Sequence, residues 1–314
     1  MNTFTALIKR EILDGMNGYI RVPAILAALS VFLVVVSTIG FGATIEFDDV
    51  LVHGDDVNSF GEALEMARNS KEGPEQLPAA VTLSYWVMGG ISWVALPFVV
   101  FFSLLSALYE ERRDRSILFW KSMPVADWQE VLAKLVTPVV VAPLVFLGVA
   151  IAAQLLIAFF LSIVVLFQGG PMLEMWPLAT MFGTWFFFVT HYAISTLWVL
   201  PLLAWVLFVS SYAGRLPFMW AVLPPAVIAA IEGILFKTTR FLEWFGIHAG
   251  GWQAFAYGHM DVDIDGPKDV LNLIFGGVQW DAFTYTVSSG QFWIGLVIAG
   301  GFVFGAIEQR KRAI

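Results

Sequence analysis

The sequence predicts an all-α protein that crosses a membrane six times. Short charged connections separate six long apolar stretches, at residues 21–45, 82–108, 135–167, 177–209, 216–236 and 291–307. Each stretch offers about 20 helical residues, the length that a hydrocarbon layer roughly 30 Å thick requires. The stretches are continuously apolar and do not alternate with a period of two, which favours helices over the strands of a barrel.

The composition is that of a membrane protein. The chain is 59% hydrophobic and 13% charged, with a mean hydropathy of +0.78, whereas about a quarter of a soluble domain is charged. The formal net charge of -8 gives no support to a nucleic-acid partner, and we expect none. The chain has no cysteine, so no disulfide can link its outer loops.

The basic residues predict the orientation. Connections on the same side as the N-terminus hold twelve of the 17 Lys and Arg residues: Lys9, Arg10, Arg21, Arg112, Arg113, Arg115, Lys121, Lys134, Arg215, Arg310, Lys311 and Arg312. The other side holds Arg68, Lys71, Lys237, Arg240 and Lys268. Because basic loops stay in the cytoplasm, both termini are expected there, as an even number of spans requires.

The first 20 residues predict an amphipathic helix before the first span. Its apolar residues recur at helical spacing: Phe4, Leu7, Ile8, Ile12, Met16 and Tyr19. Charged residues lie between them, so the helix suits the cytoplasmic membrane interface. The alternative is a helix that packs on another segment of the protein. The pattern is not that of a cleavable signal peptide.

Two long outer loops complete one transmembrane domain that covers residues 1–314. The loop at 46–80 is acidic and predicts a short helix around Gly61–Asn69. The loop at 237–290 is rich in aromatic residues, which suit the outer bilayer interface. Its apolar run Val270–Val278 is too short to span and predicts a re-entrant or interfacial segment between spans five and six.

Motifs for catalysis are absent from the sequence. It has no G-x-x-x-x-G-K-[ST] loop, no H-E-x-x-H and no G-x-S-x-G. We therefore expect no enzyme activity, and no cofactor bound by this chain itself.

The inner loop at 109–134 is the most specific segment. A charged extension of the second span is followed by an apolar patch and a turn at Pro124. Asp127 is then expected to cap a short helix that contains Glu130 and Lys134 and leads into the third span. Apolar residues gather in this otherwise charged loop: Ile117, Leu118, Phe119, Trp120, Met123, Val125 and Trp128. Such a patch favours docking on a partner. The alternatives are packing on the membrane surface, or ordinary cytoplasmic charge with a solvated turn.

This layout resembles the permease subunits of type-2 ATP-binding-cassette (ABC) exporters. In that family, the span-two extension and a short coupling helix dock on a separate ATPase subunit, which binds ATP and Mg. The resemblance implies export, a location in the bacterial inner membrane, and a dimer with a second permease copy or paralogue. The apolar, aromatic spans favour a hydrophobic or amphipathic substrate over a small ion. It places ATPase coupling at Glu110, Arg112, Arg113, Arg115, Lys121, Pro124, Asp127, Trp128 and Glu130. The second function class is a non-transport membrane protein, such as an assembly or sensor component.

Three polar residues lie inside the predicted spans, where lipid makes them costly: Gln154, His191 and Glu232. His191 suits either an interhelical hydrogen bond or a proton relay. Glu232 is expected to reach the outer interface or to pair with Lys237 or Arg240.

A weak metal candidate lies in the last outer loop. Asp261, Asp263 and Asp265, followed by Gly266, match the first half of a calcium loop. The twelfth position is Asn272, where the motif places a bidentate Glu. An acidic turn without metal is therefore the alternative.

Overall fold

The structure, a computed structural model, describes residues 3–40, 51–52, 55–56, 59–251, 266–275 and 279–312. The helices in the N-terminal half of the chain are α1 (Thr3–Asp14), α2 (Val22–Gly40), α3 (Phe60–Asn69), α4 (Gly73–Gly89), α5 (Ile91–Ala107), α6 (Tyr109–Arg113), α7 (Ile117–Ser122), α8 (Asp127–Val136) and α9 (Ala142–Phe167). They continue as α10 (Leu178–Tyr212), α11 (Pro217–Ile231), α12 (Arg240–Ala249), α14 (Pro267–Phe275), α15 (Gln279–Ser288) and α16 (Gly290–Arg312). Shorter helical pieces are η1 (Asn17–Arg21), η2 (Thr137–Val141), η3 (Met172–Met175) and η4 (Glu232–Phe236). The strands β1 (Leu51–Val52) and β2 (Asp55–Asp56) form one antiparallel pair.

Six segments of the described chain are long and apolar enough to cross a membrane. They are Asn17–Thr38, Ile91–Arg113, Asp127–Phe167, Met172–Tyr212, Pro217–Phe236 and Gly290–Arg312. Each contains most of one predicted stretch. The protein is therefore an all-α, multi-pass membrane protein, as the sequence predicted.

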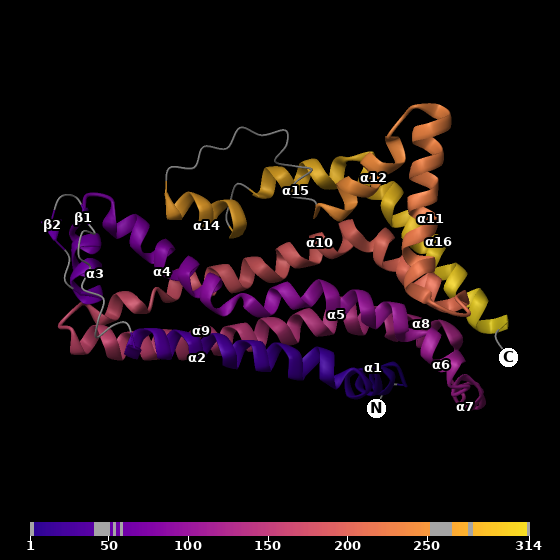
Figure 1. Cartoon of the computed structure of the whole chain (residues 1–314), viewed down its shortest axis with the longest axis horizontal. Helices are drawn as coiled ribbons and strands as arrows, with labels where there is room; N and C mark the ends of the chain where they lie inside the picture. The colour runs from indigo at the N-terminus through magenta and orange to yellow at the C-terminus, as the bar shows by residue number, and fades with distance from the viewer. Residues whose placement is uncertain are drawn as a thin grey trace.

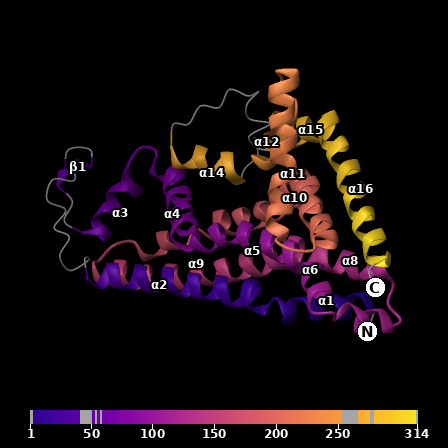
Figure 2. The ribbon, with the colours of Figure 1, turned by 45° about the vertical axis from the view of Figure 1, so that its right-hand side comes forward.

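The spans form an elongated bundle with two distinct ends. Helices α2, α5, α9 and α10 run along its length, with α3 at one end (Figures 1 and 2). The other end holds α1, α6, α7 and α8 together with both termini (Figures 1 and 2). Helix α11 leaves this end at a steep angle to α2 and α9 in both views. Because both termini lie at one end, the arrangement fits an even number of crossings.

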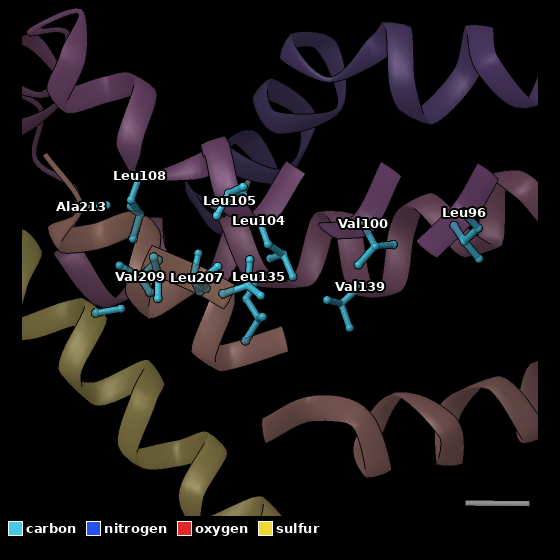
Figure 3. Packing of buried hydrophobic residues seen from close by; sticks show 14 of the residues in the cluster. Leu96, Val100, Leu104, Leu105, Leu108, Leu135, Val139, Leu207, Val209 and Ala213 are labelled. Atoms are coloured by element: carbon cyan, nitrogen blue, oxygen red, sulfur yellow. The ribbon is translucent and has the colours of Figure 1, made fainter. Parts of the chain in front are cut away.

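The main apolar core lies near the end with both termini. Leu104 of α5, Leu135 of α8 and Leu207 of α10 meet there (Figure 3). Phe146 of α9 is completely buried in the same cluster. Lipid is as apolar as these side chains, so the helices associate through close van der Waals packing and not through exclusion of water.

The second span is interrupted, although the sequence predicted one continuous stretch at 82–108. Helix α4 ends at Gly89 and α5 begins at Ile91, with Gly90 between them. Gly89 packs closely on α9, because a Cβ there would lie 3.4 Å from Gln154 Cγ. Helix α4 begins at Gly73, inside the loop predicted at 46–80, so that loop is shorter than expected.

Three π-helical turns interrupt the spans: η1, η2 and η4. In η2, Pro138 lacks the amide hydrogen that a regular α-helix would use, and it lies at the start of the widened turn. Both η1 and η2 lie next to the elements that carry the charged cluster described below. The sequence analysis predicted none of these turns.

The smaller predicted helices are present with shifted bounds. Helix α3 matches the helix expected around Gly61–Asn69, and Ser59 caps it by accepting a hydrogen bond from the Glu62 amide at 3.2 Å. Helix α14 covers most of the run predicted at Val270–Val278. Helix α1 covers the middle of the helix predicted over residues 1–20, and η1 then begins the first span.

Candidate functional site

Seven charged side chains from four helices meet at the end of the bundle that holds both termini. They are Arg10 and Glu11 of α1, Glu111 of α6, Asp127, Glu130 and Lys134 of α8, and Arg310 of α16. We call this group the ion cluster. It joins the N-terminal helix, the extension of the second span, the start of the third span and the end of the sixth.

Glu130 lies at the centre of the ion cluster. Its side chain is 3% exposed, and its Oε2 lies 2.7 Å from Arg10 Nη2 and 3.8 Å from Arg310 Nη2. Arg10 Nη1 also donates to Glu130 Oε1 at 3.2 Å. Glu130 was predicted to contact an ATPase subunit, but the structure buries it between α1 and α16. It therefore cannot contribute directly to a docking surface in this conformation.

Glu111 is the second bridging carboxylate. Its Oε2 accepts from Arg310 Nη1 at 2.5 Å, and its Oε1 lies 3.0 Å from Lys134 Nζ. Lys134 also donates to Glu11 Oε1 at 3.1 Å. Each buried cation thus contacts carboxylates of more than one helix, which ties the four helices together.

The ion cluster pairs three cationic side chains with four carboxylates, so most of its buried charge is compensated. Burial alone would lower the pKa of the Arg10 guanidinium, but the hydrogen bonds that Arg10 donates to Glu130 and Glu11, together with the charges of these carboxylates, outweigh burial and raise that pKa. Arg10 consequently stays charged at any physiological pH. Buried pairs of this kind add little net stability against an apolar alternative, yet removing one partner leaves a costly uncompensated charge.

The ion cluster does not fit a metal ion. The carboxylate oxygens of Glu11, Glu111 and Glu130 lie within 4.8 Å of one another, as ligands of one ion would. However, Arg10, Lys134 and Arg310 already contact these oxygens. A cation placed among them would face strong repulsion.

Asp127 does not cap α8, so that prediction is wrong. The N-cap residue is Ala126, and Asp127 is the first helical residue. Asp127 Oδ1 instead lies 3.3 Å from Arg310 Nε. Its carboxylate still lies near the positive end of the helix dipole, but its partner comes from the other end of the chain.

Arg112 caps α10 and does not face outward for docking. Its Nη2 donates to the carbonyl oxygens of Ser210 at 2.7 Å and Ala213 at 2.8 Å. Carbonyls in the last turn of a helix have no partner within that helix. Arg112 therefore fixes the extension of the second span to the end of the fourth.

The other predicted coupling residues lie on the surface. Glu110, Arg113, Arg115, Lys121, Pro124 and Trp128 are all exposed. Beside them lies an exposed apolar patch, which we define as Leu118, Phe119, Met123 and Trp128, with exposures of 55%, 58%, 42% and 50%. Three members of the predicted apolar set are not part of this patch. Ile117 is buried, Val125 is half-buried, and Arg10 covers Trp120 at 4.1 Å from its ring centroid.

The three polar residues predicted inside the spans do not form one site. Gln154 is buried in α9 and accepts a hydrogen bond from Trp185 Nε1 at 2.7 Å. His191 lies half-buried on α10. Glu232 lies in η4, at the far end of α11.

Glu232 caps helix α12. Its carboxylate accepts from the backbone amides of Arg240 at 3.0 Å and Phe241 at 2.8 Å, and from the Thr238 hydroxyl at 2.7 Å. Within the described part of the chain, this carboxylate contacts Arg240 through the backbone amide and accepts no hydrogen bond from the guanidinium. The alternative that Glu232 reaches the outer interface stays a prediction. The carboxylate satisfies amides of the first turn of α12, which have no partner within the helix.

The calcium candidate at Asp261, Asp263 and Asp265 lies outside the described residues.

Sequence reasoning missed Arg310 as a site residue, because it reads as one of three consecutive basic residues at a cytoplasmic end. Arg10, Glu11 and Lys134 were visible only as charges on amphipathic helices. Arg10 lies on the same helix face as the apolar residue Leu7. This position could have indicated that the Arg10 side chain faces other parts of the protein. However, no pattern in the sequence around Arg10 indicates that it pairs with a residue of α8.

Comparison of the chain with protein-family models, with curated proteins and with solved structures gave no match.

Proposed function

We propose that this protein is the membrane-spanning permease subunit of an ATP-driven exporter of the type-2 ABC kind. In this proposal, a separate subunit binds ATP and Mg, and a second permease copy or paralogue completes the transporter. Both termini lie in the cytoplasm of a bacterial cell, with the spans in its inner membrane. The substrate is hydrophobic or amphipathic.

The exposed apolar patch carries the proposal. It lies at the end of the bundle that holds both termini, and Arg113, Arg115 and Lys121 are exposed beside it. This segment thus exposes large apolar side chains in a region of high charge, which is typical of a surface that a partner covers.

The ion cluster supports the same function in a second way. Helix α8 presents Trp128 outward, while Glu130 and Lys134 bind it to α1, α6 and α16. A force applied by a partner on α7 and α8 would therefore act on several spans together. A loosely attached loop could not transmit such a force.

Affinity purification in a mild detergent tests the proposal. The wild-type chain should retain an ATP-hydrolysing subunit, and Phe119→Asp should lose it because a charge replaces the centre of the exposed apolar patch. Leu173→Asp is the matched control, since Leu173 is 77% exposed in η3, which contacts α3 through Glu174 and Arg68, and α3 lies at the opposite end of the bundle (Figure 1). Equal recovery of an ATPase with both variants would contradict docking at this patch. ATP hydrolysis by the isolated, mass-verified chain would contradict the need for a partner.

A further inference from the structure

Helix α16 runs between the ion cluster and the group of helices that follow the fifth span. It continues without interruption from Gly290 to Arg312, over 23 residues, which corresponds to about 34 Å at 1.5 Å per residue. At one end, the Arg310 side chain is 2% exposed and contacts Glu111 of α6 and Asp127 of α8. This end of α16 can therefore move only together with α6 and α8, unless those ion pairs break.

Close packing on α10 supports α16 along its length. The Phe302 ring centroid lies 5.2 Å from that of Trp205 and 5.8 Å from that of Phe208. A Cβ at Gly305 would lie 2.8 Å from Phe208 Cε2, so the Phe208 ring packs directly against the backbone of α16 there. Interfaces packed in this way shift between discrete arrangements and do not deform continuously.

The other end of α16 supports helix α12 through His248. A Cβ at Gly295 would lie 2.9 Å from His248 Nε2, so only glycine leaves room for this imidazole. His248 is completely buried and stacks on Trp198 of α10, with ring centroids 4.9 Å apart. Its Nδ1 donates to the Trp244 carbonyl at 2.9 Å, since that carbonyl can only accept.

We propose that α16 acts as a rigid rod that couples the ion cluster to helix α12, with Arg310 and Gly295 as its two contact points. A displacement of α6 or α8 at Arg310 shifts α16 against α10. That shift moves the surface at Gly295 on which His248 rests. Arg310 is thus a positioning residue for α12, a helix that it does not touch.

This coupling is a property of the chain alone, so it can be tested without an ATPase. The sequence has no cysteine, and spin labels can be attached to cysteines introduced in the full chain at Leu242 in α12 and Leu173 in η3, which are 55% and 77% exposed. We expect Arg310→Gln to shift the distance between the labels by about 2 Å, or to broaden its distribution. Arg310→Lys keeps a cation beside Glu111 and should restore the original distance.

Lys311→Gln is the matched control for Arg310→Gln. The Lys311 side chain is exposed and pairs with Glu308 of its own helix, so its loss should leave the distance unchanged. An unchanged distance in Arg310→Gln would overturn the proposal.

A second experiment runs in the opposite direction and does not depend on the stability of the Arg310 variant. Labels at Ser122 in α7 and Phe304 in α16 report on the end near the ion cluster. Gly295→Ala forces His248 to shift and should change this distance, because coupling between two sites is reciprocal. Gly300→Ala should not, since a Cβ at Gly300 meets nothing within 4 Å. The same distance in Gly295→Ala and the unsubstituted chain would also overturn the proposal.

Discussion

Arg310 donates a hydrogen bond to Glu111 at 2.5 Å, although 199 positions separate the two residues in the chain. The contact joins the end of the sixth span to the extension of the second. Both side chains are almost fully buried, at 2% and 10% exposure. The elements at this end of the bundle are therefore held together by charge pairs as well as by apolar packing.

Removing Glu111 should destabilise the protein. Glu111→Ala leaves Arg310 and Lys134 with fewer carboxylates in a buried place, and breaking a buried pair in this way costs about 3–5 kcal/mol. The expected result is a clearly lower unfolding temperature of the purified protein in detergent. Glu110→Ala is the control, because Glu110 is the residue next to Glu111 and its carboxylate is exposed. Equal unfolding temperatures for the two variants would show that the ion cluster does not hold these helices.

Asp127→Ala and Glu130→Ala should differ from each other. Asp127 makes one contact with Arg310 at 3.3 Å and is 30% exposed, so its loss should cost no more than about 1 kcal/mol. Glu130 is buried between two arginines, and its loss should lower stability as strongly as that of Glu111. In a complex with the proposed ATPase subunit, Asp127→Ala is expected to remain folded and to show weaker stimulation of ATP hydrolysis by the proposed substrate. Full stimulation in this variant would count against α8 as the coupling element.

Glu232→Gln should loosen the start of α12. A neutral amide is a weaker acceptor for the Arg240 and Phe241 amides, and loss of a cap costs about 1 kcal/mol. Hydrogen exchange should therefore become faster over residues 240–249. Glu243→Gln serves as the control, because the Glu243 side chain accepts from Thr239 and is not bound to those amides. If hydrogen exchange over residues 240–249 is the same in Glu232→Gln and Glu243→Gln, Glu232 does not anchor α12.

The contact between α14 and α4 should depend on pH. Lys268 Nζ lies 2.6 Å from Glu75 Oε2. The hydrogen bond from Lys268 lowers the pKa of Glu75 below its usual 4.5, and the same bond raises the pKa of Lys268 above its usual 10.5. Both side chains are thus charged between the two usual pKa values. The contribution of the pair to the contact between α14 and α4 is lost when the pH falls below the Glu75 pKa or rises above the Lys268 pKa.

A spin-label pair on Ile274 of α14 and Val87 of α4, which are 39% and 79% exposed, would measure this dependence. The distance should stay constant near neutral pH and change once the pH falls through the lowered pKa of Glu75. In Lys268→Met the acid-induced change should disappear. An identical acid response in Lys268→Met would assign the change to other carboxylates.

Cysteine labelling tests the orientation. A cysteine at Ser59 or Ser288 should react in spheroplasts with a reagent that cannot cross membranes, whereas one at Ser122 should react only after lysis. The chain has no cysteine of its own, so the background is clean. The reverse pattern would place both termini outside the cell.

Hydropathy predicted the spans well because the requirement for about 20 apolar residues is local. The break between α4 and α5 at Gly89–Gly90 lies inside the apolar stretch predicted at 82–108, where hydropathy alone gives no signal. The start of α4 at Gly73 was missed, because an acidic segment with prolines reads as a loop. Pro74 is nevertheless compatible with the first turn, where its missing amide hydrogen would have no partner.

The site was predicted less completely than the spans. The segment 109–134 was correctly singled out for its surface apolar residues, of which Leu118, Phe119, Met123 and Trp128 are exposed. Its charges were misassigned where the partner lies far along the chain. Glu130 pairs with Arg10 and Arg310, and Arg112 with carbonyls of α10, and no local pattern records such pairings.

The length of α10 has a consequence for the surrounding lipid. Its 35 residues extend over about 52 Å, against a hydrocarbon thickness of roughly 30 Å. The helix, which contains Pro201, must therefore tilt, kink, protrude or thicken the bilayer around it, and mismatch of this kind costs a fraction of a kcal/mol per ångström. Arg112 fixes the end of α10 to the second span, so any tilt is shared with that span. Activity should accordingly depend on acyl-chain length, with an optimum in thicker bilayers and a decline as the lipids shorten.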